Sequence, residues 1–229
     1  MKRYSWAVIL FLLCVAWAAA SAEEAQVVFF QSFDEGVQVG EKPLNVGSLA
    51  AWAVVEYPEG SGNYCLQATV SHQNLHLVFD QPVQIKPGRE VVVTLKYCAT
   101  GQFNNQYIEG NFWLMSSQYG YGVRHRLLNP NGGGARFTKI NGAWHSYETI
   151  TDWVMTPGRD WGQWGSLQLV WAYDTLEVYV DGYLCDSITV DSYLDETIDR
   201  LVIWNYWRAQ DTVDGIYYDD VKVEVIDRL

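Results

Sequence analysis

The chain has 229 residues, with 27 acidic against 15 basic side chains and a formal net charge of −12 at neutral pH. Such a surface repels phosphate backbones, so we expect no nucleic-acid partner, and acidic polysaccharides are disfavoured unless a local basic patch binds them. The length and the 49% share of hydrophobic residues suit one β-sandwich domain with a sizeable core.

The N-terminus has the pattern of a secretory signal. Two basic residues precede an apolar stretch at residues 9–20, and small side chains follow at Ala20 and Ala22. We expect cleavage after Ala22, with residues 1–22 as signal peptide and residues 23–229 as one secreted domain, periplasmic or extracellular. The apolar stretch is shorter than the ~20 residues of a membrane-spanning helix, so no span is expected after signal removal.

Beyond residue 26, apolar and polar side chains alternate at a period of two, the pattern of half-buried strands. The clearest strands are predicted at residues 91–98, 107–115, 167–171, 176–181 and 220–225. Clusters of Gly, Pro and Asn mark turns between them, and no long segment has apolar residues at helical spacing. Many short strands at fairly even spacing predict an all-β sandwich or closed barrel.

Three cysteines follow the signal, namely Cys65, Cys98 and Cys185. An odd number in an exported chain allows at most one internal disulfide. We expect either three buried thiols or one disulfide and one thiol, because the spacings do not resemble a zinc site.

Two stretches resemble a known superfamily. Residues 164–182, which end in Tyr179-Val180-Asp181-Gly182, resemble the strand–turn–strand hairpin of laminin G-like domains. Residues 33–36 and 217–223 resemble the first and last strands of many jelly-roll carbohydrate-binding modules. The chain thus resembles the concanavalin A-like (laminin G-like) jelly-roll superfamily, which implies a two-sheet antiparallel β-sandwich with adjacent terminal strands. That fold hosts lectins, binding modules, hydrolases, lyases and adhesion domains, so the resemblance leaves the function open.

The two terminal motifs carry four acidic side chains, Asp34, Glu35, Asp219 and Asp220. If the terminal strands pair, these carboxylates can meet, and a cation would relieve their mutual repulsion. Calcium takes several oxygen ligands at about 2.3–2.6 Å, so we expect a structural Ca²⁺ site here. The alternative is solvated charge at the strand ends.

The strand at residues 107–115 has two distinct faces. Ile108, Phe112 and Leu114 share the face that we expect to be buried, and Tyr107, Glu109, Asn111 and Trp113 share the other. Trp204, Tyr206 and Arg208 form a similar row. Flat rings stack on the apolar face of a pyranose, and neighbouring carboxylate and amide groups bind its hydroxyls. We therefore expect these seven residues to form an exposed carbohydrate-binding face; the alternative is that the rings only fill or cover the sandwich.

Arg124 and Arg126 point to the same side of a strand, and His125 points away. Paired arginines can hold a uronate carboxylate, and jelly-roll polysaccharide lyases combine such arginines with a Tyr or His base. Tyr119 and Tyr121 are nearby in the sequence, but salt bridges explain the arginines equally well. Glycoside hydrolysis needs two carboxyl groups about 5–10 Å apart, and Glu109 is the only acid on its strand.

These observations favour a secreted carbohydrate-recognition or adhesion-type domain without catalytic activity. One alternative is a polysaccharide lyase or glycoside hydrolase of the same fold. Another is a structural envelope protein that binds a second protein. The sequence leaves the glycan and the oligomeric state open.

Overall fold

The structure is a computed structural model that describes residues 25–34, 52–72, 74–102, 108–116, 119–128, 133–141, 147–160, 162–191, 197–207 and 212–228. Within those ranges there is no helix long and apolar enough to cross a membrane. The strands are β1 (Ala25–Gln31), β2 (Trp52–Glu56), β3 (Tyr64–Ala68), β4 (Asn74–Gln84), β5 (Arg89–Gln102), β6 (Ile108–Met115), β7 (Tyr119–Leu128), β8 (Gly133–Asn141), β9 (Tyr147–Thr149), β10 (Val154–Thr156), β11 (Gly165–Ala172), β12 (Thr175–Val180), β13 (Tyr183–Thr189), β14 (Thr197–Tyr206) and β15 (Thr212–Asp227).

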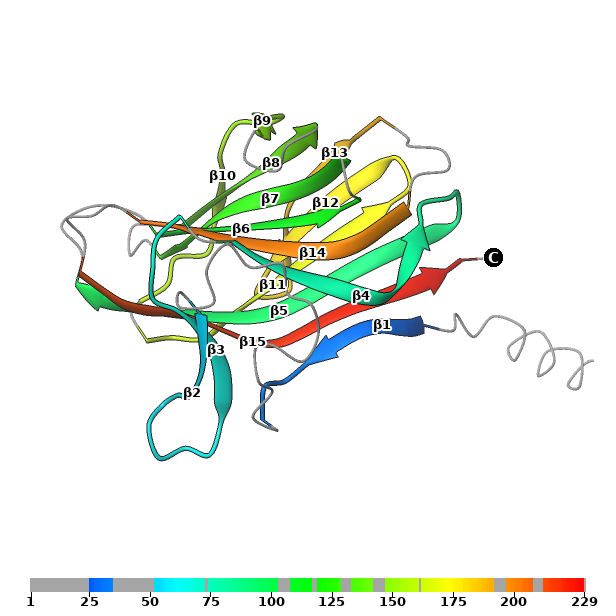
Figure 1. Ribbon diagram of the computed structural model, residues 1–229. Helices are drawn as coiled ribbons and strands as arrows, with labels where there is room; N and C mark the ends of the chain where they lie inside the picture. Colours follow the sequence, from blue (N-terminus) through cyan, green and yellow to red (C-terminus); the bar gives the residue numbers. More distant parts are fainter. Residues whose placement is uncertain are drawn as a thin grey trace, which may run out of the picture.

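The strands form two antiparallel sheets that pack face to face (Figure 1). The eight-stranded sheet has the order β13-β12-β11-β5-β15-β3-β2, with β1 paired to β15. The seven-stranded sheet has the order β10-β8-β7-β6-β14-β4, with β9 paired to β8. The pairing of β1 (blue) with β15 (red) places the terminal strands side by side, as the sequence predicted. The predicted fold class, a two-sheet antiparallel β-sandwich, is confirmed.

The core lies between the two sheets and follows the alternation of each strand. β12 alternates strictly between half-buried and buried positions, with Leu176, Val178 and Val180 inward. From the other sheet, Phe112 is fully buried and meets Tyr218 of β15 edge to face, with ring centroids 5.8 Å apart. The inward row predicted for β6 is therefore confirmed.

All three cysteines after residue 22 are free thiols. Cys65 and Cys98 are buried and pack with Tyr217 on the eight-stranded sheet, away from the main core. Burial raises the pKa of the Cys65 thiol to about 12, so it stays protonated near neutral pH. Cys185 is half-buried. The structure therefore agrees with three thiols and not with one disulfide and one thiol.

Candidate functional site

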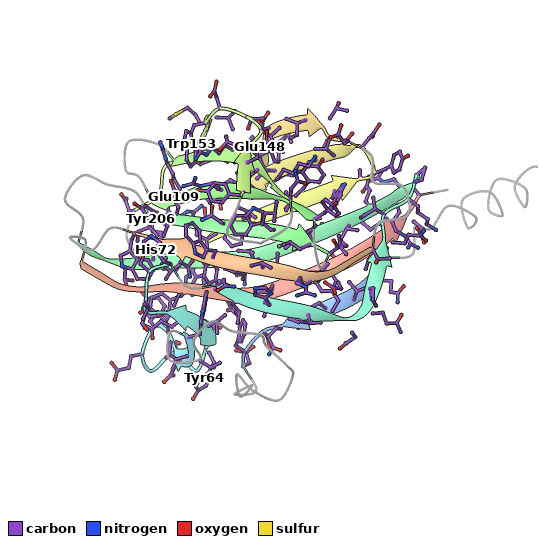
Figure 2. All side chains as sticks on the ribbon, turned by 45° about the horizontal axis from the view of Figure 1, so that its top comes forward. Tyr64, His72, Glu109, Glu148, Trp153 and Tyr206 are labelled. Atoms are coloured by element: carbon purple, nitrogen blue, oxygen red, sulfur yellow. The ribbon has the colours of Figure 1, made fainter. Side chains whose placement is uncertain are left out.

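The face of the seven-stranded sheet that points away from the core, here called the outer face, carries the polar and aromatic side chains. One cross-strand row consists of Trp204, Asn111, Arg124 and Arg136, on β14, β6, β7 and β8 in that order. The next row consists of Tyr206, Glu109 and Arg126. Figure 2 shows Trp153, Glu109, Tyr206 and His72 along one side of the molecule. The predicted facing of Arg124 and Arg126 is correct.

Glu109 and Arg124 form a buried ion pair at the centre of this face. Glu109 is 1% exposed. Arg124 donates from Nε to Glu109 Oε2 at 3.1 Å, and its Nη2 contacts the same oxygen. Arg124 Nη1 also donates to the Tyr147 hydroxyl at 2.5 Å. Glu109 was expected to be exposed, which is wrong, because it is buried and its carboxylate holds Arg124 in place.

Three guanidinium groups surround one indole ring. The Cζ atoms of Arg126, Arg136 and Arg124 lie 3.9, 4.5 and 5.9 Å from the centroid of Trp153. We call Arg124, Arg126 and Arg136 the arginine cluster. Burial, and then the charge of Arg124, lower the pKa of Arg136, and Glu109 offsets this effect. Trp153 is half-buried and directly precedes β10, so no strand pattern in the sequence assigned it to this face.

A second group of rings lies on the same face at β14. Trp204 and Tyr206 are half-buried and nearly parallel, with centroids 6.1 Å apart and an interplanar angle of 24°. The exposed His72 meets both rings edge-on, at 5.7 Å from Trp204 and 4.9 Å from Tyr206. We call His72, Trp204 and Tyr206 the aromatic row. Trp204 and Tyr206 were predicted, whereas His72 lies in the turn before β4 and was missed.

Two predicted site residues are on the expected face but are buried. Trp113 is 2% exposed, and its indole Nε1 donates to Thr138 Oγ1 at 2.9 Å. Asn111 is completely buried and donates to the carbonyl of Trp204 at 3.2 Å. The indole of Trp113 fills the space left by a missing side chain at Gly122. The expectation that Trp113 and Asn111 are exposed is therefore wrong.

Neighbouring rings complete the cover over Trp113. Tyr147 and Trp204 flank its indole at centroid distances of 6.0 and 6.3 Å. Alternation identified the correct side of the strand, but not the rings that cover it. Tyr107 and Arg208, which were also predicted for this face, lie outside the described residues.

Three of the expected calcium ligands are near one another: Asp34 follows β1, and Asp219 and Asp220 lie within β15. Asp220 pairs with Lys96, whose Nζ lies 2.5 Å from Oδ2, and Asp219 accepts a hydrogen bond from Asn63 at 3.3 Å. Burial, and then the charges of Asp220 and Asp34, raise the pKa of Asp219, while hydrogen bonds partly offset this shift. Among the described residues, no three His, Cys, Asp or Glu side chains are grouped to hold a metal ion, and Glu35 lies outside them.

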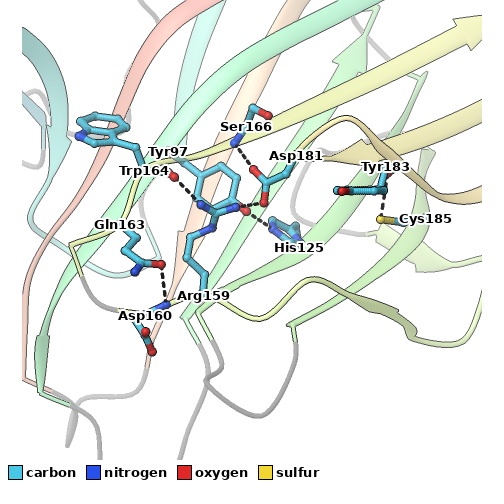
Figure 3. A network of polar contacts seen from close by, with 10 residues as sticks. All are labelled: Tyr97, His125, Arg159, Asp160, Gln163, Trp164, Ser166, Asp181, Tyr183 and Cys185. Carbon is cyan, nitrogen blue, oxygen red and sulfur yellow. Dashed lines mark hydrogen bonds and ion pairs between the residues drawn. The ribbon is translucent and has the colours of Figure 1, made fainter.

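His125 belongs to a separate, buried network that connects the two sheets (Figure 3). Its Nε2 lies 2.7 Å from the hydroxyl of Tyr97 on β5, and its Nδ1 lies 3.2 Å from the carbonyl oxygen of Gly134. Arg159 covers the Tyr97 ring and pairs with Asp181. Because a carbonyl only accepts, Nδ1 donates to Gly134. Burial lowers the pKa of His125 to about 4, so near neutral pH the imidazole is neutral and Nε2 accepts from the Tyr97 hydroxyl. Its burial removes His125 as a base beside the arginine cluster.

This network makes the protein sensitive to acid. Burial lowers the pKa of His125 from 6.5 to about 4. Below about pH 6.5 the unfolded chain gains a proton that the folded protein does not, so the free energy of unfolding falls by about 3 kcal/mol between pH 6.5 and 4. We expect His125→Gln to reduce this pH dependence in urea unfolding. An unchanged dependence in the variant would contradict the assignment.

No protein-family profile and no curated protein sequence matches the chain. Solved structures do match its fold. A CBM2 module of the evolved Dit protein of Lactobacillus casei BL23 phage J-1 has a TM-score of 0.58 at 11% identity, over 90% of this chain and 97% of that one. A Bacillus subtilis protein of unknown function with a galectin-like fold has a TM-score of 0.55 at 10% identity, over 91% and 100%.

A third match is an enzyme. The conserved carbohydrate esterase of the Shiga toxin-encoding bacteriophage phi24B has a TM-score of 0.56 at 12% identity, over 88% of this chain and 99% of that one. The fold of the present chain is an antiparallel jelly-roll β-sandwich. At these identities the likeness concerns the fold alone, which agrees with the predicted concanavalin A-like architecture.

Proposed function

We propose that the outer face binds a glycan without cleaving it, and that the domain is exported by the signal at residues 1–22. The observation that carries the proposal is the aromatic row, where two nearly parallel rings with an exposed imidazole lie beside charged side chains. Such rings stack on the apolar face of a sugar, and polar neighbours bind its hydroxyls. The match to a module named for carbohydrate binding supports the same function.

The state of Glu109 supports binding without hydrolysis. A glycosidase needs one carboxyl group to donate a proton and a second to act as base or nucleophile. Glu109 is buried and its Oε2 is held by Arg124, so this carboxylate is poorly placed to exchange protons with a substrate. The burial of His125 likewise supports binding over the lyase alternative.

A glycan array followed by titration calorimetry tests the proposal. We expect Trp204→Ala and Tyr206→Ala each to weaken binding by about tenfold or more, because each loses one stacking surface. Tyr183→Ala is the matched control, since Tyr183 is 69% exposed on β13 of the other sheet. Equal weakening by the control, or release of sugar products in the same mixtures, would contradict the proposal. Binding of a protein but of no glycan would favour the envelope-protein alternative.

Calcium at Asp34, Glu35, Asp219 and Asp220 remains a proposal. Burial raises the pKa of Asp219 most, and repulsion from Asp220 and Asp34 adds to the shift. A cation would offset that repulsion, although Lys96 already supplies one positive charge. If Ca²⁺ binds only the folded protein, about 100 times its Kd adds roughly 2.7 kcal/mol to the free energy of unfolding. We expect a chelator to lower the Tm of the unmutated protein and to leave the Tm of Asp34→Ala unchanged. A Tm of the unmutated protein that does not respond to chelator would rule out this site.

A further inference from the structure

The arginine cluster is an exception to the charge of the molecule. The chain has a net charge of −12, yet three guanidinium groups lie within 6 Å of one indole centroid. The buried carboxylate of Glu109 forms an ion pair with Arg124 of the cluster. The outer face thus gathers three basic side chains around one ring in an acidic protein.

Packing on Trp153 explains only part of this arrangement. Cation–π contacts stabilise each guanidinium modestly, by about 0.5–2 kcal/mol in proteins. They do not use the N–H donors, however, and Arg136 Nε is buried without a hydrogen-bond partner in the described part of the chain. Burial lowers the pKa of Arg136 most, and repulsion from the nearby charges of Arg124 and Arg126 lowers it further. A bound anion would supply the missing acceptor and reduce the repulsion.

The cluster is continuous with the aromatic row. Trp204, Asn111, Arg124 and Arg136 occupy one cross-strand row on four neighbouring strands. With strands about 4.8 Å apart, the backbone positions of Trp204 and Arg124 are separated by about 10 Å. That span requires an oligosaccharide rather than a single sugar. A chain that stacks on Trp204 and Tyr206 can therefore place a later sugar over the arginine cluster.

We propose that Arg124, Arg126 and Arg136, arranged around Trp153, form an anion subsite that selects a glycan bearing carboxylates, such as a uronic acid polymer. This inference rests on the proposed glycan binding. A guanidinium is a planar fork of N–H donors that matches the two oxygens of a carboxylate. Arg124 is fixed by Glu109 and Tyr147, whereas the buried Nε of Arg136 has no hydrogen-bond partner in the described part of the chain and needs an acceptor.

The test compares acidic polymers with their carboxyl-reduced forms on the unmutated protein. The probes are oligomers of galacturonate, of alginate and of hyaluronan, with chondroitin sulfate as a sulfated relative of hyaluronan. We expect calorimetry to show that at least one acidic oligomer binds, that carboxyl reduction weakens its binding about tenfold or more, and that added salt also weakens it. Arg136→Gln should weaken the binding of the same oligomer to a similar degree. Arg228→Gln removes the same charge at an exposed position just after β15 and should have no effect.

The outcomes separate this inference from the proposed function. If a neutral glycan binds through Trp204 while no acidic oligomer binds, the anion subsite is overturned and glycan binding stands. The same holds if carboxyl reduction and Arg136→Gln leave the affinity unchanged. If the sulfated polymer binds and none of the three carboxylate oligomers does, selection of a carboxylate is overturned. If no glycan of either kind binds, both proposals fail.

Discussion

Replacing Arg124 by alanine is expected to lower the free energy of unfolding by about 3–5 kcal/mol, because it leaves the buried carboxylate of Glu109 without its partner. This is a large part of the total stability of an ordinary domain, about 5–15 kcal/mol. Chemical denaturation of the purified domain measures the effect.

A second variant separates the ion pair from general packing. Glu109→Gln combined with Arg124→Met removes both charges and keeps much of the side-chain volume. Such double replacements of buried ion pairs are often neutral in stability. We therefore expect the double variant to be far more stable than Arg124→Ala. If Arg124→Ala costs less than about 1 kcal/mol, the pair behaves as an exposed one and the buried geometry described for Glu109 is contradicted.

Phe112→Ala is expected to lower the free energy of unfolding by about 3–5 kcal/mol, because it removes a fully buried ring at the contact between the two sheets. Phe30→Ala is the matched control, since Phe30 is 56% exposed on β1, and it should change stability by about 0.5 kcal/mol or less. Similar losses in both variants would contradict the assignment of the core.

Trp113, the neighbour of Phe112, was predicted to be exposed but is buried, and its truncation distinguishes the two cases. If Trp113 were exposed, Trp113→Ala would leave the stability unchanged. Because Trp113 is buried, we expect Trp113→Ala to lower the free energy of unfolding by about 3–5 kcal/mol. Because its ring lies on the outer face beside Trp204, the same variant should also disturb the aromatic row. A Trp113→Ala protein with wild-type stability would restore the original expectation.

The alternation of apolar and polar residues predicted correctly which face of the sheet each side chain is on. It did not predict which of the outward side chains are buried by other residues. The period of two places Phe112 inward, and Glu109 and Arg124 on the opposite face, because successive side chains point to opposite faces of a sheet. Whether an outward residue is exposed depends on strands distant in the sequence. Trp113 is buried because Gly122 of β7 leaves space and Trp204 of β14 adds a ring. Nothing in the sequence around Trp113 indicates that it packs against these two residues.

The residues that were missed have a similar explanation. His72 and Trp153 lie between strands, where no periodicity assigns a face. Arg136 alternates with the buried Phe137, which was a usable signal, but its place beside Arg124 follows only from the pairing of β7 with β8. The arginine cluster therefore emerged from strand register, whereas the acidic composition of the chain gave no sign of it.

The most direct test of glycan binding at the outer face is ¹H–¹⁵N NMR of the tryptophan side chains during titration with a glycan that the array identifies. We expect the indole signals of Trp204 and Trp153 to shift, because both rings are half-buried on that face. The signal of Trp171 should stay fixed, because that ring is 2% exposed in the core and its Nε1 donates to the carbonyl of Tyr173 at 3.0 Å. A bound glycan that leaves the signals of Trp204 and Trp153 unmoved would place the binding site elsewhere and contradict the account.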